Sequence, residues 1–132
     1  VRGNLADLQQ PGALIVANHP SLIDTVFMMS FIPRVNCIVS ADRLGNPFLG
    51  AVIRGSQYIL NSEDPEQLLQ RCKQALHDGN SLLVFPEGTR NVPGKPMTLK
   101  RGAARIALLA DAPIVPVAIN CDPRTLTKGE KW

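Results

Sequence analysis

Five short apolar runs, separated by segments of helical character, are the feature that most limits what this 132-residue chain can fold into. Each run has the length of a strand, and most are rich in β-branched residues. An alternation of such strands with helices favours an α/β domain, with a largely parallel or mixed sheet of about five or more strands flanked by helices. The runs are ALIVA (13–17), VNCIVS (35–40), SQYIL (56–60), SLLVF (81–85) and IVPVAI (114–119).

Three of the intervening segments have a helical pattern. The clearest spans residues 65–78, where Asp64 is suited to cap the helix and Pro65 to occupy its first position. A second helix is expected over about 99–110, with small and apolar residues facing inward. A third is expected to start near Pro20. We therefore expect helices on the connections between strands.

The chain is expected to form a single domain over residues 1–132. Hydrophobic residues make up 45% of it, enough for a substantial core, and no repeat or linker interrupts the pattern. Because it opens without methionine and stops soon after its last apolar run, we expect it to be part of a longer protein.

Composition argues against several classes of protein. The formal charge of +3 is small and aromatic residues make up 5%, which argues against a nucleic-acid-binding surface. No apolar run approaches the roughly 18 residues that a membrane span needs. The three cysteines are odd in number and far apart, so they indicate neither a disulfide framework nor a metal site, and they fit a reducing cytosolic setting.

A histidine and an aspartate follow the first apolar run. In a parallel α/β sheet, ligands collect beyond the carboxyl ends of the strands, where His19 is expected. Asp24, expected inside the following helix, could bond one ring nitrogen and leave the other as a base toward an alcohol. Alternatively, His19 caps a turn and Asp24 is a solvated helix residue. Ser21 as a nucleophile is weakly supported, and a metal site lacks an obvious third ligand, since His77 ends an amphipathic helix.

The segment FPEGTR, residues 85–90, follows another predicted strand and should reach the same edge of the sheet. Gly88 permits a tight turn whose backbone N–H groups face a ligand, and Arg90 suits phosphate. Alternatively, the segment is a turn with a surface pair of Glu87 and Arg90. Lys100 and Arg101 begin the later helix near this loop, although a solvated basic face explains them equally well.

Three segments in order carry a resemblance to a known family. NHPSLID resembles the first block of the glycerolipid acyltransferases (1-acyl-sn-glycerol-3-phosphate or lysophospholipid acyltransferase type), FPEGTR resembles the third, and IVPVAI the fourth. The resemblance implies a glycerol-3-phosphate acyltransferase-like fold. It also implies that His19, oriented by Asp24, deprotonates the hydroxyl of a lysolipid, which attacks the thioester of acyl-CoA or an acyl carrier protein without a covalent acyl-enzyme.

The resemblance also implies a set of binding residues and partners. No cofactor or metal is implied, since the acyl thioester is a co-substrate, and the expected partners are the lysolipid, the acyl donor and a membrane surface. Val115, Pro116 and Val117 of the last predicted strand would support the pocket. The residues expected to bind substrate are Ser21, Glu87, Gly88, Thr89, Arg90, Lys100 and Arg101.

The second block departs from the family pattern. Asn61 and Ser62 stand where an arginine is expected to hold the acceptor phosphate. Lysophosphatidic acid is therefore the first-ranked acceptor through the family alone, and another lysolipid or a glycolipid remains an alternative. A thioesterase-like hydrolase and a non-catalytic lipid-binding module are the rival functions.

Two apolar segments, 27–33 and 47–53, could touch a membrane interface or line an acyl groove. We expect the protein on the cytoplasmic side of the membrane, peripheral or anchored through segments absent from this chain. Phe27 and Val52 are expected in the core, and the residues expected to contact lipid are Met28, Met29, Phe31 and Phe48.

Overall fold

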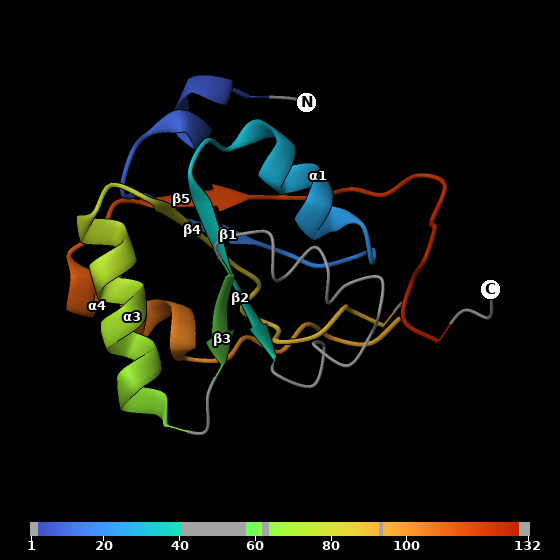
Figure 1. The fold of residues 1–132 in the computed structure, drawn as a ribbon. Helices are drawn as coiled ribbons and strands as arrows, with labels where there is room; N and C mark the ends of the chain where they lie inside the picture. Colours follow the sequence, from blue (N-terminus) through green and yellow to red (C-terminus); the bar gives the residue numbers. More distant parts are fainter. Residues whose placement is uncertain (1–2, 41–57, 62–63, 93, 130–132) are drawn as a thin grey trace.

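The computed structural model describes residues 3–40, 58–61, 64–92 and 94–129, and it confirms the predicted α/β fold (Figure 1). Five strands form one sheet in the order β3-β2-β4-β1-β5, and every pair of neighbours is parallel. The strands are β1 (Leu14–Ala17), β2 (Val35–Ser40), β3 (Tyr58–Asn61), β4 (Ser81–Val84) and β5 (Ile114–Val117).

Helices cover both faces of this sheet. α3 (Pro65–His77) and α4 (Gly102–Ala110) pack side by side on one face, whereas α1 (Asp24–Phe31) and the short 3₁₀ helix η1 (Leu5–Gln9) lie on the other (Figure 1). Within the described part of the chain, no helix has the length and apolar character needed to cross a bilayer.

The central strands contribute side chains to two cores, one on each face of the sheet. Leu14 and Leu82 point toward α3 and α4, while Ile15 and Leu83 point toward α1, and all four side chains are fully buried. Burial on both faces explains why these strands appear in the sequence as continuous apolar runs without alternation.

Two helices begin later than predicted, whereas α3 agrees closely with its prediction. Asp64 caps α3 by accepting the Glu66 N–H at 2.9 Å. α4 begins at Gly102 and not at 99, because the Lys100 N–H donates to the Pro86 carbonyl at 2.8 Å and so is bonded outside the helix. α1 begins at Asp24, after a turn, and not near Pro20.

Two predictions about the side chains of α1 are wrong, because its consecutive apolar residues do not mark which face is buried. Phe27 is 59% exposed and not in the core, whereas Met28, expected to contact lipid, is buried at 6%. Asp24, Met28 and Ile32, spaced by four residues, form the buried side of α1, whereas Ile23, Val26 and Phe27 are exposed. Met29 and Phe31 are half-buried, and the predictions for Phe48 and Val52 lie outside the described residues.

The parallel arrangement brings several chain segments to one edge of the sheet. β1, β4 and β5 are neighbours, so the residues that follow Ala17, Val84 and Val117 leave the sheet side by side. The two predicted motifs after β1 and β4 therefore lie next to each other. They lie beyond the carboxyl ends of the strands, where α/β sheets bind their ligands.

Candidate active site

His19 and Asp24 form a hydrogen-bonded pair at this edge. The distance between His19 Nδ1 and Asp24 Oδ2 is 3.0 Å, and their side chains are 16% and 5% exposed. Because a carboxylate only accepts hydrogen bonds, Nδ1 carries the hydrogen and Nε2 is left as the proton acceptor of the neutral ring. The pair therefore has the arrangement of a general base with an orienting carboxylate.

A tight turn between β1 and α1 holds this pair together. Asp24 Oδ2 also accepts the Ser21 N–H at 2.6 Å, so one carboxylate oxygen fixes both the turn and the imidazole. The Ser21 side chain is buried and its Oγ donates to the Thr125 carbonyl at 2.9 Å. Ser21 therefore binds the C-terminal segment in this structure, and its predicted contribution to substrate binding stays a prediction.

The FPEGTR loop after β4 packs directly against His19. Glu87 is buried, and its Oε1 accepts the His19 backbone N–H at 3.0 Å. Gly88 has a φ of +70°, the conformation for which the turn needed a glycine, and the Lys100 Nζ would lie 2.7 Å from a Cβ placed there. The structure thus brings Glu87, Gly88 and Lys100 to the site.

The cationic and hydroxyl residues of this loop face the C-terminal segment. Arg90 Nη1 donates to the carbonyls of Leu126 at 2.8 Å and Thr127 at 3.4 Å. Lys128 Nζ donates to Thr89 Oγ1 at 3.1 Å. Residues 125–128 therefore lie across both motifs, and sequence patterns gave no signal for them.

Two neighbours of His19 were also missed. The Asn18 side chain joins β1 to β5, since its Oδ1 accepts the Ile119 N–H at 2.6 Å and its Nδ2 donates to the Ile119 carbonyl at 2.9 Å. Phe85 stacks on the imidazole with ring centroids 4.2 Å apart. The sequence signals that could have identified them are the asparagine that precedes the histidine in N-H-x-x-x-x-D and the aromatic residue before P-E-G-T-R.

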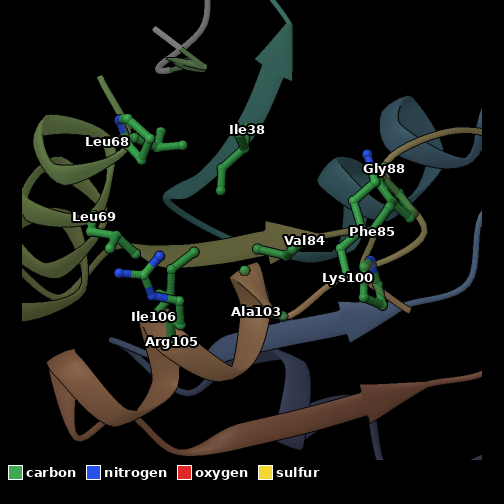
Figure 2. Close-up of a pocket in the computed structure, with 13 residues that line it drawn as sticks. Ile38, Leu68, Leu69, Val84, Phe85, Gly88, Lys100, Ala103, Arg105 and Ile106 are labelled. Carbon is green, nitrogen blue, oxygen red and sulfur yellow. The ribbon is translucent and has the colours of Figure 1, made fainter. Parts of the chain in front are cut away.

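An apolar pocket of about 200 Å³ opens on the α3 and α4 side of the sheet (Figure 2). Val84, Ala103 and Ile106 line it, and leucines of α3 face them. Phe85 lines the pocket and also stacks on His19, so one side chain joins the pocket to the imidazole. Lys100 and Arg105 add positive charge to its lining, whereas Arg101 is exposed at the start of α4.

The buried thiols have no place in this chemistry. Burial raises the pKa of Cys37 to about 12 and that of Cys72 to about 11, so both stay protonated and pack as apolar side chains. Burial, and secondarily the nearby Cys37, also raise the pKa of Tyr58. Neither cysteine has the low pKa and access that a nucleophile needs.

Other predicted features fall at or beside this edge. Val115 and Val117 pack on the core beneath α1, although Pro116 between them is exposed. Asn61 ends β3 and is exposed, and Ser62 lies outside the described residues. Among the residues that are described, no three His, Cys, Asp or Glu side chains are grouped so that they could hold a metal ion.

Comparisons with known proteins identify a family and a related fold. The model of the protein family described as Acyltransferase matches residues 2–120. The 1-acyl-sn-glycerol-3-phosphate acyltransferase of Helicobacter pylori is 34% identical over 112 residues, which cover 80% of this chain and 47% of that protein. The Pseudomonas aeruginosa protein of the same name is 29% identical over 137 residues, covering 100% of this chain and 50% of its own length.

A solved structure is also similar. The crystal structure of the 1-acyl-sn-glycerophosphate (LPA) acyltransferase from Thermotoga maritima superposes with a TM-score of 0.80 at 26% identity. The match covers 97% of this chain and 53% of that one. The chain thus spans about half the length of the relatives that it matches.

Proposed function

The chain belongs to the acyltransferase family, and from this premise we propose that it moves a fatty acyl group from a thioester donor to the hydroxyl of a lysophospholipid. The acceptor we rank first is 1-acyl-glycerol-3-phosphate, because relatives with that name match across most of the chain. The donor is acyl-CoA or an acyl carrier protein, and the reaction belongs to phospholipid synthesis.

The hydrogen bond between His19 Nδ1 and Asp24 is the observation that carries this proposal. Nε2 takes the proton of the acceptor hydroxyl, and the hydroxyl oxygen attacks the thioester carbonyl. The C–S bond then breaks, and the imidazolium returns the proton to the leaving thiolate. No acyl-enzyme forms, in keeping with the buried, protonated state of Cys37 and Cys72.

Positive side chains near the FPEGTR loop support an acidic head group. Lys100 lies over Gly88, and Arg90 belongs to the loop itself. Arg101 follows at the start of α4. A guanidinium and an ammonium at one sheet edge suit a phosphate monoester, and in this proposal they take the place of the arginine expected at Asn61, although Arg90 Nη1 also bonds the carbonyls of Leu126 and Thr127.

A screen of acceptors with labelled acyl-CoA tests the function. The wild-type protein is expected to form a diacyl product, with a rate for lysophosphatidic acid about tenfold above that for a lysolipid without an acidic phosphate monoester, because a charge-assisted contact contributes about 1.5–3 kcal/mol. If a glycolipid were acylated fastest, it would replace 1-acyl-glycerol-3-phosphate as the proposed acceptor. Free fatty acid released with every acceptor would indicate a hydrolase, and donor binding without turnover would indicate a binding module.

The outward face of α1 supports contact with a membrane surface. Ile23, Val26 and Phe27 are exposed only a few residues after His19. Bonds from residues 21 and 22 to carbonyls of 125 and 126 hold the C-terminal segment beside the start of α1, and that segment carries the exposed Arg124 and Lys128. Apolar side chains flanked by cations are suited to the interface of an anionic bilayer.

Replacing Val26 and Phe27 with serine is expected to weaken sedimentation with phosphatidylglycerol-containing vesicles about tenfold, since two exposed apolar side chains that would enter the interface are lost. Turnover of a short-chain, soluble acceptor should stay near the wild-type value. The matched control replaces Leu108 and Leu109 of α4 with serine, because Leu108 is 85% exposed on the opposite side of the sheet. Equal loss of vesicle binding in both double variants would contradict a contact through α1.

We also place the protein at the cytoplasmic face of the membrane. Its three described cysteines are unpaired, which supports a reducing compartment. A thiol reagent that does not cross membranes, applied from either side, checks this placement. Cys121, the most accessible of the three thiols, is expected to react with reagent applied from the cytoplasmic side and not from the other side.

A further inference from the structure

The loop after β4 holds His19 at three points. The Glu87 carboxylate accepts the His19 N–H at 3.0 Å, and the Asn91 N–H donates to the His19 carbonyl at 2.9 Å. The Phe85 ring stacks on the imidazole at an angle of 20°. Both sides of the His19 peptide, as well as its ring, are thus fixed by a segment almost 70 residues away in the chain.

The burial and chemistry of Glu87 show what this carboxylate is suited to do. It is 7% exposed, and a buried carboxylate is retained where it receives hydrogen bonds. A bond from a backbone N–H to a charged oxygen is shorter and about twice as strong as a neutral one. A carboxylate also has no hydrogen to donate to a phosphate and repels its charge. Glu87 is therefore better suited to hold His19 than to bind an acidic head group.

Two carboxylates then control different parts of one residue. Asp24 Oδ2 sets the rotation and tautomer of the ring through Nδ1, while Glu87 sets the position of the backbone from which the ring projects. A displacement of a catalytic group by about 1 Å can cost about 100-fold in rate. We propose that Glu87 is a positioning residue for His19, and that it acts through the His19 backbone and not as a ligand of the acceptor.

The kinetic part of the test rests on the proposed function. Glu87→Ala is expected to lower kcat for acyl transfer about 100-fold with the KM of the lysolipid within about twofold of wild type. Glu87→Gln keeps an oxygen acceptor for the His19 N–H and is expected to lose only about tenfold. Glu66→Gln, the same change at an exposed residue in the first turn of α3, should match wild type.

The second part of the test needs no turnover. The sequence contains two histidines, so ¹⁵N-histidine labelling gives one backbone amide signal for His19 and one for His77. The His19 amide proton is expected to resonate downfield in wild type and to move upfield in Glu87→Gln, while the His77 signal stays in place. A His77→Gln variant assigns the two signals.

The two parts separate failure of this inference from failure of the proposed function. A wild-type protein without transferase activity would reject the function, while the amide shift would still test the bond to Glu87. An unchanged His19 amide in Glu87→Gln would overturn the inference. A raised KM with an unchanged kcat would also overturn it, because Glu87 would then contact the acceptor. If Glu87→Ala does not fold, Glu87→Gln carries both measurements.

Discussion

Replacing His19 with alanine is expected to lower kcat for acyl transfer about 10⁴-fold, the largest effect of any change considered for this protein. General-base catalysis contributes about 10²–10⁴-fold, and no other described side chain at this edge combines a neutral nitrogen acceptor with an orienting carboxylate at 3.0 Å. The backbone bonds of residue 19 to Glu87 and Asn91 do not depend on its side chain. The variant should therefore keep its fold while losing its base.

The measurement is the initial rate of diacyl product formation from labelled acyl-CoA and lysophosphatidic acid. His77→Ala is the matched control, since His77 is exposed in the last turn of α3 and lies away from the sheet edge. Because the His19 ring is partly open to solvent, added imidazole is expected to restore part of the lost rate. Wild-type turnover in His19→Ala would reject a mechanism based on this residue.

The strands and the α/β class could be predicted because burial on both faces leaves a plain signal. Each continuous apolar run became a strand with boundaries within about two residues of the prediction. The order of the strands in the sheet could not be predicted from the sequence. It depends on pairings such as Val35 with Ser81 and Leu14 with Ile114, which join residues far apart and have no local pattern.

The side chains of α1 show where an apolar pattern fails to mark the buried face. Phe27 was expected in the core and Met28 at the lipid, whereas Phe27 lies outward and Met28 inward, because apolar residues occupy consecutive positions of this helix. The Asp24 carboxylate accepts the Ser21 N–H and so ends the turn before the helix begins. This side-chain cap, three residues from its partner, competes with helix formation over 20–23.

The pairing of His19 with Asp24 could be predicted because both residues lie in one short motif. The hydrogen bond from the His19 backbone N–H to Glu87 could not be predicted. Any residue except proline has a main-chain N–H, so such a bond leaves no pattern in the sequence. The contacts of Arg90 with carbonyls of Leu126 and Thr127 were hidden for the same reason. Sequence motifs therefore named the reacting groups better than their supports.

Asp24→Asn is expected to lower kcat about 10³-fold while changing the melting temperature little. One oxygen of Asp24 accepts both the Ser21 N–H at 2.6 Å and the His19 Nδ1–H at 3.0 Å. An asparagine oxygen at the same position can keep both bonds, so the turn before α1 is expected to survive. What disappears is the negative charge that stabilises the imidazolium while His19 holds the substrate proton.

The same labelled histidines report the state of the ring. In wild type the neutral ring of His19 should carry its hydrogen on Nδ1, and Asp24→Asn should leave it there, because the asparagine oxygen still accepts from Nδ1. Asp111→Asn is the matched control, since Asp111 is exposed at the end of α4 in a left-handed conformation that asparagine adopts readily. If Asp24→Asn kept more than about a tenth of the wild-type kcat with an unchanged tautomer, Asp24 would only cap the turn.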